Sequence, residues 1–126
     1  MYFIITNDIV LNDVVITDPT GEKQLAGYDN LHIPGNSVVA VVGDSGCGKT
    51  TLMRCLNRYY PYTSGDITLF GNKLHTYSQQ ELTDQLMYVP QKAFFFAGTV
   101  RDNLTYGLSR TISDEELISA LRNVCL

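Results

Sequence analysis

The residues that could carry chemistry gather in one short stretch, Gly43-Asp44-Ser45-Gly46-Cys47-Gly48-Lys49-Thr50. This stretch fits the pattern G-x-x-x-x-G-K-[ST], in which a glycine-rich turn surrounds the phosphates of a nucleotide. Glycine lets the backbone adopt conformations that a Cβ forbids, so successive N–H groups can turn inward around an anion. A helix that begins near Lys49 would point the positive end of its dipole at the same anion. The stretch therefore predicts nucleotide binding.

The side chains that follow the glycines have separate predicted roles. Lys49 should reach the β- and γ-phosphates, which makes it a candidate catalytic residue as well as a binding residue. The Thr50 hydroxyl should ligate Mg²⁺, and Thr51 is placed to hydrogen-bond the α-phosphate. Cys47 is interpreted as a small residue that fits between two glycines. The complete predicted binding set is Gly43, Ser45, Gly46, Cys47, Gly48, Lys49, Thr50 and Thr51.

The elements around this loop are those that the motif requires. Residues 37–42 contain a continuous apolar run that predicts a strand covered on both faces, and such strands favour a parallel sheet. A helical pattern follows from about Lys49 to Arg58. The alternative is a glycine-rich turn with an incidental Lys-Thr pair, which leaves the order strand, loop and helix unexplained.

The rest of the chain mixes strands and helices. Further strands are predicted at residues 9–17, 23–33, 66–70 and 86–89, and short helices are predicted to open at Ser78, Thr99 and Ser113. The predicted fold class is therefore α/β: a partial P-loop core of parallel strands and helices, with an N-terminal antiparallel β portion.

The composition excludes several classes of protein. The 126 residues suit one domain, and 44% hydrophobic residues are too many for a disordered chain. The sequence contains no run of 18 apolar residues, the length that a helix needs to span a bilayer. Nine Lys and Arg against thirteen Asp and Glu give a net charge of −4, which argues against nucleic acid as a partner. The three cysteines lack metal-ligand spacing and no signal-peptide pattern is present, so reduced thiols and a cytosolic chain are expected.

Three segments after the loop resemble the ATP-binding domain of ABC transporters. Pro61–Gly71 resembles the P-x-S-G-x-I-x-x-x-G strand and turn, and Tyr88–Gln91 resembles the Q-loop. Phe96–Leu104, FAGTVRDNL, resembles the F-x-G-T-[IV]-x-[DE]-N-[IL] segment that is typical of exporters in this family. The resemblance implies three parts: an antiparallel β portion over 1–36, a phosphate-loop core through the Q-loop over 37–92, and the start of a helical subdomain over 93–126.

The same resemblance implies ligands and partners. The ligands would be ATP and Mg²⁺, and Gln91 would be a catalytic and metal-binding residue that senses the γ-phosphate; an amide suits this role because it both donates and accepts. The simpler alternative for Gln91 is a polar residue at a strand end. The partners would be the transmembrane domains of a transporter and a second ATP-binding domain in a head-to-tail dimer. The chain would then work at the cytoplasmic face of the cell membrane.

Phe94-Phe95-Phe96 allows two interpretations. In the family this region lies near the groove that receives helices of the membrane domain, so an exposed aromatic side chain here would belong to an interface. The alternative is that two of the three rings fill the core.

The chain also departs from the family pattern. An aromatic residue that stacks on adenine is expected where Asp18 stands, and a carboxylate has no π-face, so Tyr2 or Phe3 would have to replace it. No Walker B strand, L-S-G-G-Q signature or switch histidine is found in the sequence; Asp114-Glu115 follows no apolar strand, and His75 is predicted to be a surface residue. We therefore expect this polypeptide to bind nucleotide without hydrolysing ATP at a transport-relevant rate, and to self-associate through an exposed sheet edge.

Two other functions stay open. A small P-loop kinase or GTPase would need an arginine-rich lid or an N-K-x-D motif, and the sequence shows neither. A non-catalytic protein or regulatory fragment that binds nucleotide or a partner is compatible with every motif above.

Overall fold

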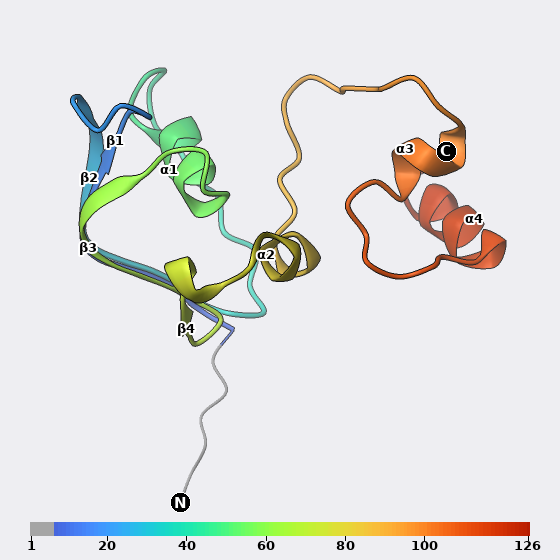
Figure 1. The fold of residues 1–126 in the computed structure, drawn as a ribbon, viewed down its shortest axis with the longest axis horizontal. Coiled ribbons are helices and arrows are strands. Elements are labelled where there is room, and N and C mark those ends of the chain that lie inside the picture. The colour runs from blue at the N-terminus through green and yellow to red at the C-terminus, as the bar shows by residue number, and fades with distance from the viewer. Residues whose placement is uncertain (1–6) are drawn as a thin grey trace, which may run out of the picture. The chain divides into compact units, whose positions relative to one another are not determined.

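The computed structural model describes residues 7–126 and divides the chain into a first unit that ends at Tyr77 and a second unit, Ser78–Leu126 (Figure 1). The first unit contains β1 (Ile9–Thr17), β2 (Gln24–Ile33), α1 (Lys49–Leu56), β3 (Tyr62–Leu69), β4 (Asn72–Lys73) and the 3-10 turn η1 (Leu74–Thr76). The second unit contains α2 (Gln79–Gln85), α3 (Val100–Leu104) and α4 (Asp114–Asn123). Within residues 7–126, no helix has the length and apolar character needed to cross a membrane.

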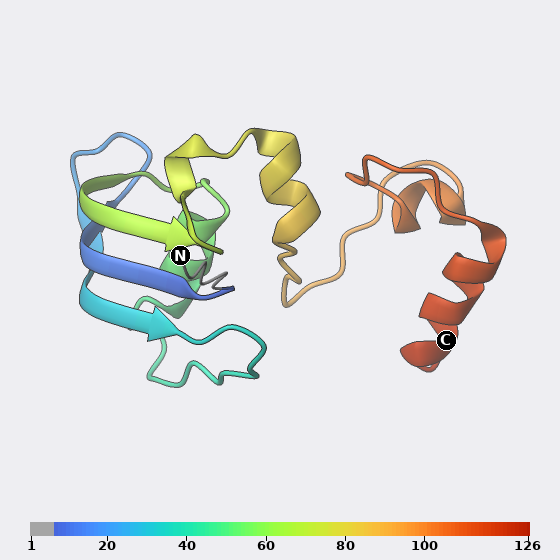
Figure 2. The same ribbon diagram turned by 90° about the horizontal axis from the view of Figure 1, so that it is seen from below.

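The first unit is an antiparallel sheet that curves around α1 (Figures 1 and 2). The strand order is β2-β1-β3-β4, so β1 lies in the middle and pairs with β2 on one side and β3 on the other. The helix lies on the concave face, where apolar side chains of both layers meet. The buried residues of this core are Leu11, Val14, Ile16, Leu52, Cys55, Leu56, Ile67, Leu69, Leu74 and Tyr77.

A bulge in β1 explains how its apolar residues reach one face. Leu11 and Val14 are three positions apart, which would place them on opposite faces of a regular strand. Asp13 adopts a φ of 50°, and the pairing of β1 with β3 shifts register between Asn12 and Val15. The extra residue moves Val14 onto the face of Leu11, and both are buried.

Each of the three helices in the second unit begins with a capping box. Ser78 and Ser113 each accept a hydrogen bond from the backbone N–H three residues later, and the glutamate at that third position bonds back to the cap. Thr99 and Asp102 form the same arrangement at α3. The predicted helices at these three positions are confirmed.

The predicted parallel strands are not formed. Residues 37–42 and 86–89 are irregular, and Val38, Val42 and Val89 are exposed rather than covered on both faces. All strand pairs among the described residues are antiparallel. An apolar run favours a strand only where a neighbouring strand supplies hydrogen bonds, and the order β2-β1-β3-β4 gives neither segment a partner. The fold thus shows the antiparallel portion and the helices of the predicted α/β arrangement, but not the parallel sheet.

Gly65 closes the bulge, and replacing it should be costly. Its φ is +79°, and a Cβ there would come within 2.3 Å of the Asn12 carbonyl oxygen and 2.4 Å of the Asp13 carbonyl oxygen. Gly21 is a matched control, because its φ is +78° but nothing lies within 4 Å of an added Cβ. We expect Gly21→Ala to lower the free energy of unfolding by about 1 kcal/mol, and Gly65→Ala to lower it by about 3 kcal/mol or more. Urea unfolding measures both values, and equal losses would contradict this role of Gly65.

Candidate functional site

The predicted phosphate loop leads directly into α1. Lys49 is the first residue of the helix and Gly48 is its N-cap, with a φ of 103° that residues with a Cβ rarely adopt. A hollow of about 370 Å³ lies at this end of the helix. Its lining residues are Ser45, Gly46, Gly48, Lys49, Thr50 and Thr51. Gly43 and Cys47 lie beside it in the same loop, so the structure brings together all eight residues predicted to bind the nucleotide.

The N-terminus of α1 differs from the others in the described part of the chain. Ser78, Thr99 and Ser113 each accept a backbone N–H at the start of α2, α3 and α4, and each of those first turns carries an acidic residue. In α1, by contrast, Gly48 provides no side-chain cap, and the first turn has no acidic residue. The first N–H groups of a helix need an acceptor. Those of α1 receive no acceptor from a cap side chain, and the helix dipole favours negative charge at that point.

Lys49 is folded back onto the loop that it follows. Its ammonium group donates to the carbonyl oxygens of Gly43 and Asp44, the latter at 2.9 Å, and lies 3.5 Å from the sulfur of Cys47. In this arrangement the positive charge of Lys49 is balanced by carbonyl dipoles rather than by a negatively charged group. A phosphate in the hollow would offer a stronger, charge-assisted hydrogen bond to the same ammonium group.

The cysteines of the first unit have different environments. Cys47 is exposed, and its sulfur would lie 2.5 Å from a Cβ placed on Gly43, so Gly43 is needed for the side chain of Cys47 to fold against the loop. Cys55 lies on the buried side of α1, where burial raises the pKa of its thiol to about 11. The interpretation of Cys47 as a small residue between Gly46 and Gly48 stays a prediction.

Gln91 belongs to the second unit, where it is exposed in an irregular segment. Its proposed cooperation with Lys49 and Thr50 through Mg²⁺ is therefore a prediction rather than an observed contact. The strand predicted at residues 86–89 is not formed, so Gln91 does not follow a strand in this structure, and its role stays a prediction.

The segment Phe96–Leu104 has a compact structure that explains its spacing. The Asn103 side chain accepts a hydrogen bond from the Phe96 N–H at 3.0 Å and donates to the Phe96 carbonyl oxygen at 3.1 Å and the Thr99 carbonyl oxygen at 3.0 Å. Thr99 and Asp102 close the capping box inside this loop. Three polar residues of the motif therefore form hydrogen bonds within the segment itself. The resemblance of the segment to the family motif did not assign them this role.

The three consecutive phenylalanines are not equivalent. Phe96 packs on Tyr106 with ring centroids 4.9 Å apart, whereas Phe94 and Phe95 are 83% and 78% exposed. The alternative in which two of the three rings fill a core is therefore wrong for this structure.

Asp18 has a local structural role. Its carboxylate accepts hydrogen bonds from the Thr20 hydroxyl at 2.7 Å and the Glu22 N–H at 3.2 Å, and so closes the turn between β1 and β2. The Thr20 hydrogen bond is the largest cause of a pKa below the ordinary value for this carboxyl. That Asp18 offers adenine no stacking surface stays a prediction from the sequence. Tyr2 and Phe3, the predicted replacements, lie outside the described residues.

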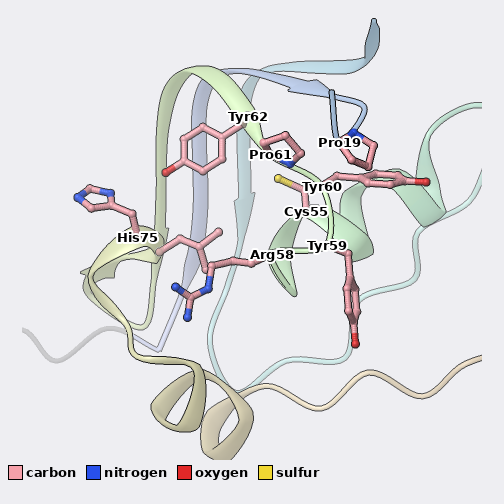
Figure 3. A pocket seen from close by; sticks show the side chains of 9 residues that line it. Pro19, Cys55, Arg58, Tyr59, Tyr60, Pro61, Tyr62 and His75 are labelled. Carbon is pink, nitrogen blue, oxygen red and sulfur yellow. The ribbon is translucent and has the colours of Figure 1, made fainter. Parts of the chain in front are cut away.

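A larger hollow, of about 610 Å³, lies at the opposite end of α1 and is lined by aromatic residues (Figure 3). Tyr60 lies on one side of it, where the Arg54 guanidinium carbon is 5.4 Å from the ring centroid and the Arg54 Nη1 donates to the Tyr60 hydroxyl at 2.7 Å. This end of the helix carries the negative end of the dipole. Size alone therefore does not identify the phosphate site, and the hollow at the N-terminus of α1 is electrostatically the better candidate.

Two residues that resemble family motifs have structural explanations. His75, in η1, is exposed, as predicted for a surface residue. Asp114 is the first residue of α4 and forms an ion pair with Arg101, which agrees with its interpretation as a helix-start residue.

A glycine-rich loop with Lys-Thr at the uncapped start of a helix has the features of a P-loop phosphate site. The chain belongs to the ABC transporter family, whose domain matches residues 28–126. It is 40% identical over 97 residues to the lactococcin-G-processing and transport ATP-binding protein LagD of Lactococcus lactis, covering 77% of this chain and 14% of that protein. It is 41% identical over 86 residues to a multidrug resistance ABC transporter ATP-binding and permease protein of the same species, covering 68% of this chain and 15% of that protein.

A third relative comes from a different organism. The ATP-dependent lipid A-core flippase of Francisella tularensis is 37% identical over 102 residues, covering 81% of this chain. The chain spans about 17% of the flippase. The matches therefore concern a small part of each of these three proteins.

The caps of the second unit should respond to acid. Asp102 has a pKa below its ordinary value, chiefly because its carboxylate accepts the Thr99 backbone N–H. A lowered folded-state pKa means that this hydrogen bond is fully present above the ordinary value of about 3.9 and is lost as the pH falls through the lower value. We expect the Thr99 amide signal to shift with a midpoint below 3.9 in an NMR titration, and Asp102→Asn to abolish the shift. A midpoint at or above 3.9 would contradict the capping role.

Proposed function

We propose that this chain is the nucleotide-binding part of an ABC exporter and binds MgATP through the loop at the start of α1. The observation that carries the proposal is the uncapped N-terminus of α1, which follows a glycine-rich loop and has Lys49 as its first residue. A loop of this kind without an acidic first turn fits a polyphosphate and would disfavour a cationic ligand.

The residues of the loop suit the parts of MgATP. The Lys49 ammonium group would exchange its contacts with the Gly43 and Asp44 carbonyls for the β- and γ-phosphates. The exposed Thr50 hydroxyl would ligate Mg²⁺, and Thr51 would hydrogen-bond the α-phosphate. Mg²⁺ would neutralise phosphate charge, and Gln91 would sense the γ-phosphate. ATP hydrolysis in the complete domain would also use residues of a second ATP-binding domain.

The partners are proposed from the family. One relative is named an ATP-binding and permease protein, which supports transmembrane domains as the main partner. The exposed Phe94 and Phe95 are the candidate contact residues for them. A second ATP-binding domain in a head-to-tail dimer is the other proposed partner. The proposed location is the cytoplasmic face of the membrane.

The main alternative is a non-catalytic nucleotide-binding or regulatory protein. It shares the loop and the same predicted affinity. Because this chain alone is expected not to hydrolyse ATP at a transport-relevant rate, the two functions differ in the turnover of the complete domain. A kinase or GTPase is disfavoured because the chain belongs to the ABC transporter family.

Replacing Lys49 should remove most nucleotide affinity. Loss of its charge-assisted hydrogen bonds to phosphate should weaken MgATP binding by about 10- to 100-fold in Lys49→Ala. The matched control is Lys73→Ala, since Lys73 lies on β4 of the same unit and pairs with Asp66 at 3.1 Å. Isothermal titration calorimetry measures the dissociation constants. Equal affinity in Lys49→Ala and the wild type would overturn the proposed site, and phosphate release that depends on Lys49 would exclude the non-catalytic alternative.

Thiol labelling gives an independent test of the loop. Cys55 should stay unlabelled at pH 7.5, because it is buried and burial raises its pKa to about 11. Cys47 and Cys125 are exposed and should react with a disulfide reagent such as dithionitrobenzoate. MgATP should slow the labelling of Cys47, which lies in the loop, but not that of Cys125 near the end of the second unit. The same rate for Cys47 with and without MgATP would show that the nucleotide binds elsewhere.

A further inference from the structure

Tyr28 connects the sheet to the phosphate loop. It lies in β2, is half-buried, and donates a hydrogen bond from its hydroxyl to the Gly48 carbonyl oxygen at 3.3 Å. It also lines a hollow together with Cys47, Lys49 and Leu52. Its position twenty residues before Gly48 makes this a contact between two different elements of the first unit.

The carbonyl that Tyr28 contacts is at the junction of the loop and α1. The same Gly48 oxygen accepts the first hydrogen bond of the helix, from the Leu52 N–H at 2.9 Å. A Cβ on Gly48 would lie 3.4 Å from the Ala26 Cβ and 3.6 Å from the Tyr28 hydroxyl. Two residues of β2 therefore pack directly against the backbone of this junction.

Peptide geometry links this carbonyl to the phosphate hollow. The Gly48 carbonyl and the Lys49 N–H belong to one planar peptide unit and point in opposite directions. A hydrogen bond that fixes the direction of the carbonyl therefore also fixes the direction of the Lys49 N–H. This N–H is among the uncapped donors at the start of α1.

The Tyr28 hydroxyl is suited to donate this hydrogen bond at neutral pH. Its pKa is raised above the ordinary value, first by burial and then by the charges that Cys47 and Cys55 would carry as thiolates. A tyrosine hydroxyl is protonated at neutral pH in any case, and the raised pKa extends its range as a donor to higher pH. Gly48 provides no side-chain cap at the start of α1, and the Tyr28 hydroxyl is a side-chain donor to its carbonyl oxygen at this junction.

We propose that Tyr28 is a positioning residue that orients the Gly48–Lys49 peptide unit for phosphate binding. The inference rests on the proposed function, since it assigns the residue that holds the proposed site in its binding geometry. Tyr28 acts through the backbone of Gly48 and makes no contact of its own with the ligand. It should therefore affect every ligand that carries a polyphosphate, whatever base or sugar is attached.

The test compares two tyrosines that make the same kind of hydrogen bond. Tyr77 donates from its hydroxyl to the Leu69 carbonyl oxygen at 2.6 Å, on β3 rather than at the start of α1. Tyr28→Phe and Tyr77→Phe are made in the full chain. Each variant loses one side-chain hydroxyl and keeps the aromatic ring. Calorimetry with MgATP, MgADP and magnesium pyrophosphate gives the affinities, and thermal unfolding gives the stability of each variant.

We expect Tyr28→Phe to weaken all three ligands by a similar factor, about three- to tenfold, as the loss of one hydrogen bond predicts. The Lys49 amide signal of the ligand-free protein should shift in its NMR spectrum. Tyr77→Phe should lower the unfolding temperature and leave the three affinities and the Lys49 signal unchanged.

Several results would overturn the inference. Unchanged affinity in Tyr28→Phe would reject it while leaving the Lys49-dependent site in place. Weaker binding of MgATP and MgADP but not of pyrophosphate would show that Tyr28 contacts the nucleoside instead. An equal loss of affinity in Tyr77→Phe would show a general effect of stability. Absence of MgATP binding by the wild type would reject the proposed function, and this inference with it.

Discussion

The packing of α1 against the antiparallel sheet is the contact on which the proposed site depends. Leu52, Cys55 and Leu56 lie on one side of the helix and are almost fully buried against the sheet. Each buried leucine contributes about 1.5–3 kcal/mol, more than a typical hydrogen bond. Lys49 and Thr50 begin the same helix. Because the three buried residues fix the orientation of α1 on the sheet, they also set the direction in which its first N–H groups point.

The four α-helices of residues 7–126 divide by how they begin. Three carry a capping box, in which the hydroxyl of the cap residue accepts the N–H three residues later and the carboxylate of that later residue accepts the N–H of the cap residue. Local side chains therefore stabilise the start of each of these helices. The start of α1 gives up such a cap, which typically contributes about 1 kcal/mol. A bound anion would restore that stabilisation. The same feature that weakens α1 in isolation therefore makes its N-terminus a place where an anion adds stability.

Sequence patterns predicted the elements whose causes are local. β1 was placed with its observed bounds from its β-branched residues, and the starts of α2 and α4 followed from Ser78 and Ser113. The strands expected at 37–42 and 86–89 failed because an apolar run supplies no hydrogen-bonding partner, and partners come from distant parts of a chain. The bulge at Asp13 was missed for a related reason, since it is closed by Gly65 across the sheet.

Local and distant contacts differ in the same way between the segment 96–104 and the phosphate loop. The loop motif does not include the distant residues that contact it. Asn103 reaches Phe96 across seven residues, so the segment 96–104 can fold around its own side chains. The phosphate loop also has contacts of its own, chiefly from the Lys49 ammonium group to the carbonyl oxygens of Gly43 and Asp44. Lys49 would give up these contacts on binding a phosphate, and the loop glycines permit many backbone conformations. Support from outside the loop that favours one conformation would lower the cost of binding. In the first unit that support comes from β2, through Ala26 and Tyr28, which the spacing of the motif does not include.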